Sequence, residues 1–196
     1  MTQLISSLEE ISAPYDLLYC DLWGCLHNGK ALFPEAVAAL QAFRRKGGAV
    51  VLLTNAPRTK HAVQKRLDAM DLPADAYDVI AASGDATQEA MLSGAAGRKL
   101  WHLGPGKDED LFTIIPEWLK DQPSIERVEL DEAEGIICTG PFDEFNETPD
   151  DYRARFLLAK TKGLKMLCAN PDLVVEVHVP ELQGDDYNDM LMRQQP

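Results

Sequence analysis

The chain has 196 residues, of which 45% are hydrophobic and 7% aromatic, a composition typical of a globular protein. Its formal net charge is −13, which argues against nucleic acid as a partner because a phosphate backbone needs a basic face. No apolar run approaches the length of a membrane span, about 18 residues, so we expect no membrane partner. Because the chain as a whole repels anions, a site for an anionic ligand must supply local positive potential from a metal, a helix N-terminus or backbone amides.

The cysteines indicate a reducing compartment. They show neither a C-x-x-C pair nor the spacing of zinc ligands. Most of them lie in apolar runs, where a thiol behaves as a small hydrophobic group. The N-terminal segment has no basic region followed by an apolar run, so we expect no signal peptide. Free thiols and this N-terminus predict a cytoplasmic protein. The four residues are Cys20, Cys25, Cys138 and Cys168.

Strands and helices alternate in the N-terminal part of the chain. The first apolar run is almost continuous, which is typical of a strand buried on both faces of a parallel sheet, and it leads directly into Asp21. The pattern predicts, in chain order, a strand at 15–20, a helix from Pro34, a strand at 49–53, a helix around Val63 and Leu67, and a strand at 77–81.

This alternation predicts βαβ units and therefore an α/β fold with a doubly wound parallel sheet. Right-handed crossovers would place the first two strands side by side. These strands lead into Asp21 and Thr54, so the two side chains would lie at one edge of the sheet. Open α/β folds bind their ligands at that edge.

A second α/β unit is predicted between residues 83 and 170. Glycines and prolines break its first part into short helical and strand-like pieces. Regular patterns return with a strand at 135–138 and a strand at 165–169. Between them, Thr148 has the features of an N-cap, and the helix that it starts runs to Lys162.

We therefore expect three parts. Residues 1–82 would form the N-terminal half of a core, residues 83–170 an inserted unit, and residues 171–196 a return to the core as an atypical or truncated tail. The tail is too short for the two or more βα units that would complete a six-stranded sheet, because each crossover needs about a dozen residues or more.

Two neighbouring strand ends carry the candidate site residues. Asp21 precedes a glycine-containing turn, and aspartate is a known nucleophile for phosphoryl transfer. Thr54, Asn55 and Ala56 end the next strand, where a hydroxyl and backbone amides would hold a phosphate oxygen. Each feature alone is equally typical of a residue that caps a loop or a helix. Together, with one βα unit between them, they form a more specific signal.

Three segments, in this order, resemble the motifs of the haloacid dehalogenase superfamily. Residues 21–29, DLWGCLHNG, resemble its first motif, and residues 52–58, LLTNAPR, resemble its second. Residues 168–172, CANPD, are similar to the end of the inserted C2-type α/β cap of its NagD-like sugar phosphatase branch, subfamily IIA. The resemblance covers about residues 13–176, which is most of the chain.

The resemblance implies a hydrolase that transfers a phosphoryl group from a small phosphorylated metabolite of the sugar phosphate class. By that resemblance Asp21 is the nucleophile and a Mg²⁺ ligand, and the Trp23 backbone carbonyl is a second ligand. Thr54, Asn55 and Ala56 would bind the transferred phosphoryl group. The cap would close over the site, exclude water and select the leaving group.

Trp23 departs from the usual pattern of the family. Phosphatases of the family have a second aspartate there as general acid, and the loss of a general acid costs about 10²–10⁴-fold in rate. Haloacid-type dehalogenases have an aromatic residue at this position, so a dehalogenase is an alternative interpretation. A subgroup of the NagD-like branch resembles the Asp-x-Trp-Gly form. His27 or a group of the substrate would then supply the proton, although His27 is expected to be a structural turn residue.

The C-terminal tail departs from the pattern as well. No lysine follows Lys165 to serve as the third-motif lysine, so charge on the intermediate would be uncompensated. The segment 184–189 resembles the acidic fourth motif, in which Asp185 and Asp189 would be the metal ligands. The apolar strand that should precede it is absent from the sequence pattern. We therefore expect impaired activity, and a non-catalytic remnant that binds a ligand or partner is another alternative. An incomplete sheet also favours a homo-oligomer.

Overall fold

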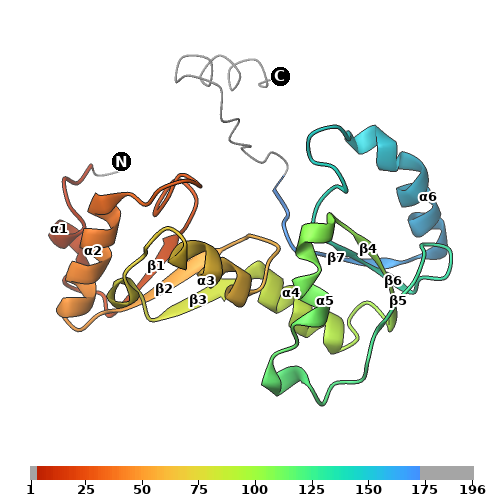
Figure 1. Ribbon diagram of the computed structural model, residues 1–196, viewed down its shortest axis with the longest axis horizontal. Helices are drawn as coiled ribbons and strands as arrows, with labels where there is room; N and C mark the ends of the chain where they lie inside the picture. Colours follow the sequence, from red (N-terminus) through yellow and green to blue (C-terminus); the bar gives the residue numbers. More distant parts are fainter. Residues whose placement is uncertain (1–3, 173–196) are drawn as a thin grey trace.

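The computed structural model describes residues 4–172, which form two lobes with the helix α4 between them (Figure 1). One parallel sheet has the strand order β1-β2-β3, and the other has the order β5-β4-β6-β7. The α/β class and the parallel strands predicted from the sequence are confirmed. Within these residues, none of the helices has the length and hydropathy that a membrane span requires.

The first lobe contains, in chain order, α1 (Glu9–Ser12), β1 (Leu17–Asp21), α2 (Pro34–Arg45), β2 (Ala49–Thr54), α3 (Lys60–Asp68), the 3₁₀ turn η1 (Ala74–Ala76) and β3 (Val79–Ala82). The linking helix α4 spans Ser83–Leu92. The second lobe contains β4 (Lys99–Leu103), η2 (Gly106–Asp108), α5 (Asp110–Thr113), η3 (Glu117–Leu119), β5 (Glu126–Arg127), β6 (Gly135–Cys138), η4 (Pro149–Tyr152), α6 (Arg153–Lys162) and β7 (Lys165–Cys168).

The register of the first sheet brings two strand ends together. In the parallel pair β1 and β2, Leu17 lies opposite Ala49 and Asp21 lies opposite Leu53. Thr54, the last residue of β2, is therefore only one position beyond the partner of Asp21. The prediction that both residues lie at the same edge of the sheet is confirmed.

The core of the first lobe lies on one face of its sheet. Val50 and Leu52 are fully buried there, together with apolar residues of α2 and α3. On the opposite face, Tyr19 is 62% exposed, Leu53 48% and Val79 53%. The expectation that the first strand is buried on both faces is wrong for residues 4–172. The order β1-β2-β3 steps in one direction, so right-handed crossovers place both α2 and α3 on the same face.

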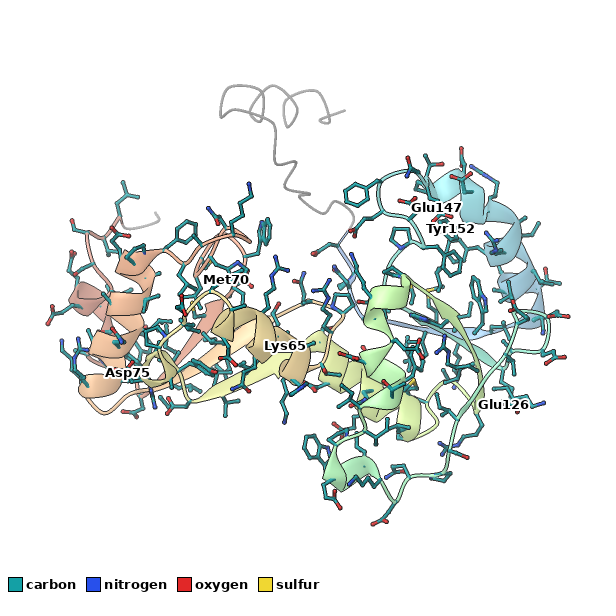
Figure 2. The ribbon with its side chains drawn as sticks, in the orientation of Figure 1. Lys65, Met70, Asp75, Glu126, Glu147 and Tyr152 are labelled. Carbon is teal, nitrogen blue, oxygen red and sulfur yellow. The ribbon has the colours of Figure 1, made fainter. Side chains whose placement is uncertain are left out.

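The second lobe is organised around buried apolar residues of β4 and β6. Its helix after Thr148 begins with the 3₁₀ turn η4, where Thr148 and Asp151 form a capping box, and continues as α6. At the start of this helix, Tyr152 lies beside Glu147 (Figure 2), and its hydroxyl group donates a hydrogen bond to the Glu147 carboxylate. The same hydroxyl oxygen accepts a hydrogen bond from the backbone N–H of Phe142 at 2.7 Å. These contacts fix the turn before the regular helix.

Residues 83–92 are more regular than the sequence predicted, while the short pieces expected after them are present as η2, α5, η3 and β5. The glycines suggested broken pieces, yet α4 starts directly at the end of β3. Gly84 lies in the first turn of α4, and a Cβ there would lie 2.2 Å from the backbone carbonyl of Arg58. This glycine permits close packing between the helix and a loop of the first lobe. Gln88, fully buried in α4, donates to the carbonyls of Leu111 and Ile114 and so attaches α4 to the second lobe.

Because the core lies on one face of the sheet, alanine substitutions at neighbouring residues of β2 should lower the free energy of unfolding by different amounts. Replacement of Leu52 by alanine removes a fully buried side chain and should lower the free energy of unfolding by about 2–5 kcal/mol. Leu53→Ala is the matched control and should cost less than about 1 kcal/mol, because Leu53 is 48% exposed. Urea unfolding measures both values, and equal losses would contradict the one-sided core.

The close contact of Gly84 predicts that a methyl group is not accepted there. Gly84→Ala should destabilise the chain by about 1–3 kcal/mol through overpacking against Arg58. This cost exceeds the gain in helix propensity, which is at most about 1 kcal/mol. Gly106→Ala is the control, because a Cβ there meets nothing within 4 Å. Thermal unfolding of the two variants compares them, and a more stable Gly84→Ala would refute the packing argument.

Candidate active site

Asp21 is exposed at the carboxyl end of β1, and its own loop orients its carboxylate. The backbone N–H of Leu22 donates to Asp21 Oδ1 at 2.7 Å. Leu22 is 4% exposed, so the apolar core anchors the residue that makes this contact. The loop then folds back tightly, with Gly24 N donating to the carbonyl of His27 at 2.9 Å and Gly24 at φ +74°. One carboxylate oxygen is thus held by backbone while the side chain remains accessible.

Trp23 and His27 stabilise this loop by packing. The two rings meet edge to face with centroids 6.0 Å apart, and the Trp23 ring lies against Gly29, where a Cβ would approach it to 2.5 Å. His27 is buried, and its Nδ1 accepts a hydrogen bond from Gly29 N at 3.0 Å. Burial and the Arg66 guanidinium lower the pKa of His27, while Asp21 acts in the opposite direction. His27 is therefore a neutral residue that shapes the turn.

The residues predicted to bind phosphate form a compact turn after β2. Thr54 is buried, and its Oγ1 accepts a hydrogen bond from the backbone N–H of Ala56 at 3.2 Å. The Ala56 carbonyl in turn accepts from Gly84 N in α4 at 3.3 Å. Asn55 is exposed and donates through Nδ2 to Asp172 Oδ2 at 2.6 Å. The structure thus brings Thr54, Asn55 and Ala56 together beside the end of β1.

The segment 54–60, hereafter the β2–α3 loop, is held from several sides. Lys60 N donates to Asp85 Oδ2 in α4 at 2.9 Å, and Thr59 caps the start of α3. Sequence reasoning missed that side chains of this loop also contact the second lobe, since nothing in the local pattern predicts such distant partners. Within residues 4–172 two such contacts occur: Arg58 Nε with Asp108 Oδ1 at 3.6 Å, and Lys60 Nζ over the Trp118 ring at 4.3 Å from its centroid.

The donor atoms at the end of β1 suit a hard divalent cation. Mg²⁺ binds oxygen ligands and commonly takes one or two carboxylates, with water and substrate phosphate as the others. The Asp21 carboxylate and the Trp23 carbonyl offer oxygen atoms of this kind. Within residues 4–172 no group of three or more His, Cys, Asp or Glu side chains converges on a metal position. Asp185 and Asp189, which the sequence suggested as further ligands, lie outside the described residues.

Comparison with known proteins agrees with the motifs. A family described as haloacid dehalogenase-like hydrolase matches residues 18–114. A haloacid dehalogenase-like family hydrolase from Brucella suis 1330 is 36% identical, with a TM-score of 0.78 over 88% of this chain and 60% of that one. Comparison with curated proteins gives no significant match.

More distant structures share the fold. The p-nitrophenyl phosphatase of Archaeoglobus fulgidus is 18% identical, with a TM-score of 0.61 over 83% of this chain and 58% of that one. NagD from E. coli K-12 is 20% identical, with a TM-score of 0.55 over 83% of this chain and 60% of that one. The chain thus spans 58–60% of the length of these three proteins. From its motifs, its fold and these matches, the chain belongs to the haloacid dehalogenase-like hydrolase family and has the fold of the NagD-like branch.

Proposed function

We propose that this chain is a Mg²⁺-dependent phosphatase that acts on a small phosphorylated metabolite, of the sugar phosphate class, through an aspartyl-phosphate on Asp21. One observation carries the proposal. The parallel register of β1 and β2 sets an accessible carboxylate beside a turn that presents the Thr54 hydroxyl and the Asn55 amide. Similarity to proteins named as phosphatases supports the reaction class.

The proposal gives each group at this edge a role. Leu22 N–H holds Asp21 Oδ1, which leaves Oδ2 to attack the phosphorus atom. As the Asp21–phosphorus bond forms, the bond to the leaving-group oxygen breaks, and water then hydrolyses the acyl phosphate. Thr54 and the second N–H of the Asn55 amide would donate to phosphoryl oxygens. Within this loop neither Trp23 nor neutral His27 is suited to protonate the leaving group, so leaving groups that depart as stable anions should react best.

Mg²⁺ would be held by the Asp21 carboxylate and the Trp23 backbone carbonyl. When bound, it would neutralise negative charge on the phosphoryl oxygens. A bound cation would also offset the electrostatic repulsion between an anionic substrate and a chain of net charge −13.

We infer that residues 83–170 are an inserted cap, that residues 1–82 are the first half of the core and that the chain returns to the core from residue 171. The two separate sheets support this division. Ser83, the first residue of the linking helix α4, donates its hydroxyl hydrogen bond to the carbonyl of Ala169, directly after β7. The chain therefore enters and leaves this lobe at neighbouring points, as an insertion requires.

The proposal also includes an oligomeric state and a cellular compartment. The exposed apolar face of the first sheet, hereafter the bare face, carries Tyr19, Leu53 and Val79 and supports a homo-oligomer. The four cysteines form no disulfide, which supports a reducing, cytoplasmic environment.

A haloacid-type dehalogenase is the second candidate, because Trp23 occupies the position of the missing acid. A non-catalytic protein that only binds a phosphorylated ligand is the third. The three differ in metal dependence and in the need for Asp21. Halide displacement needs no Mg²⁺, and simple binding does not need a nucleophile.

Asp21→Asn should abolish Mg²⁺-dependent phosphate release from 4-nitrophenyl phosphate, with a loss of about 10³-fold or more, because the amide is not a nucleophile. Asp16→Asn is the matched control: Asp16 is exposed just before the opposite end of the same strand, so this variant should keep its rate.

Release that persists in Asp21→Asn would refute the assignment of the nucleophile. Chloride release from a 2-chloro acid without metal would favour the dehalogenase. A wild-type chain that is folded and binds phosphate without hydrolysis would favour the binding protein.

A further inference from the structure

A buried carboxylate in the second lobe has no role in the chemistry described so far. The side chain of Asp108, in η2, is 1% exposed, and neither of its oxygens forms a hydrogen bond of standard geometry within residues 4–172. A charged carboxylate is almost never so buried unless it is paired. Its cationic neighbour is the Arg58 Nε, at 3.6 Å from Oδ1, in the β2–α3 loop of the first lobe.

Asp108 stands at the carboxyl edge of the second sheet. It follows the loop that leaves β4, and Thr139 follows β6 at the same edge. Gly104 lets these segments approach, since a Cβ there would lie 1.9 Å from Thr139 Oγ1. Burial raises the pKa of Asp108, while the Thr139 hydroxyl and Arg58 act in the opposite direction. The carboxylate thus faces the first lobe from a tightly packed edge.

Arg58 is fixed by its backbone and accessible through its side chain. The close contact with Gly84 holds its backbone against α4. Its side chain is 32% exposed, and its Nε faces Asp108. Burial lowers the pKa of Arg66, and repulsion from Arg58 adds to this effect, which places two cationic groups near the loop. Arg58 lies only four positions after Thr54 in the chain.

We propose that Asp108 is a positioning residue, which holds the Arg58 guanidinium from the second lobe so that its remaining N–H groups bind an oxygen of the phosphoryl group. The proposal rests on the proposed function of the Asp21–Thr54 edge. A guanidinium has five N–H donors in a rigid fork, so one donor can face Asp108 while others face an anion. Arg58 then adds local positive potential to a site in a chain of net charge −13.

This role predicts that Asp108→Asn and Arg58→Ala differ in their effect on the melting temperature but weaken phosphate binding alike. Asp108→Asn keeps the size of the side chain and removes a buried charge, so the melting temperature should stay or rise. Arg58→Ala leaves the Asp108 charge buried without its partner, so the melting temperature should fall. Phosphate binding should weaken in both variants, because each one loses the oriented guanidinium. A merely structural ion pair would leave the affinity of folded protein unchanged.

The experiment compares the full chain with Asp108→Asn, Arg58→Ala and the double variant. It measures KM and kcat for 4-nitrophenyl phosphate, the Kd of inorganic phosphate by calorimetry, and the melting temperature. Each single variant should raise KM and the phosphate Kd about tenfold, with kcat little changed, as expected for a lost charge-assisted hydrogen bond. The double variant should resemble Arg58→Ala in affinity, because the two residues act as a unit.

Asp150→Asn is the matched control, since its partner Arg153 is 79% exposed and Asp150 itself 77%. It should change neither affinity nor stability. An unchanged KM and phosphate Kd in Asp108→Asn would overturn the positioning role and leave the proposed function standing, provided that Asp21→Asn is inactive. If the wild-type chain hydrolyses nothing, the proposed function fails and the phosphate Kd values alone decide the role of Asp108. A folded chain that does not bind phosphate would refute both.

Discussion

The parallel pairing of β1 with β2 is the constraint on which the rest of the site depends. Its register sets Asp21 opposite Leu53, so the carboxylate and the β2–α3 loop emerge together at one edge of the sheet. The core holds this register from one face only, through fully buried Val50 and Leu52. A slip by one residue would move these side chains to the bare face and separate the reactive groups.

The β2–α3 loop is the junction between the two lobes. Its backbone is packed on the first turn of α4, where only glycine at position 84 allows the approach. Its Arg58 side chain reaches the Asp108 carboxylate of the second lobe, and its Asn55 side chain reaches Asp172, just after that lobe ends. The Arg58 guanidinium is thus arranged by both lobes, so a movement of one lobe relative to the other would change its orientation. Such coupling would tie closure over a substrate to completion of its binding site.

Local patterns predicted the parts of the fold that local chemistry determines. The apolar runs before Asp21 and Thr54 gave the strand ends, and the N-cap at Thr148 gave the start of a helical segment. The pattern was misleading where distant packing decides. Glycine at position 84 suggested a break, although it is the residue that lets α4 lie against the first lobe. The pairing of Arg58 with Asp108 joins residues 50 positions apart on different lobes. The only local signal for this ion pair was the positive charge of Arg58 at the end of the segment 52–58. Its partner could not be predicted, because it depends on how the lobes are arranged.

The most direct test of this account is chemical trapping of the phosphorylated residue. The full chain would be mixed with 4-nitrophenyl phosphate and Mg²⁺, quenched, and treated with borohydride, which reduces an acyl phosphate to an alcohol. Mass spectrometry of the peptides then locates the change. The account predicts reduction at Asp21 and at no other carboxylate. Reduction at a different residue, or none in a preparation that releases phosphate, would contradict it.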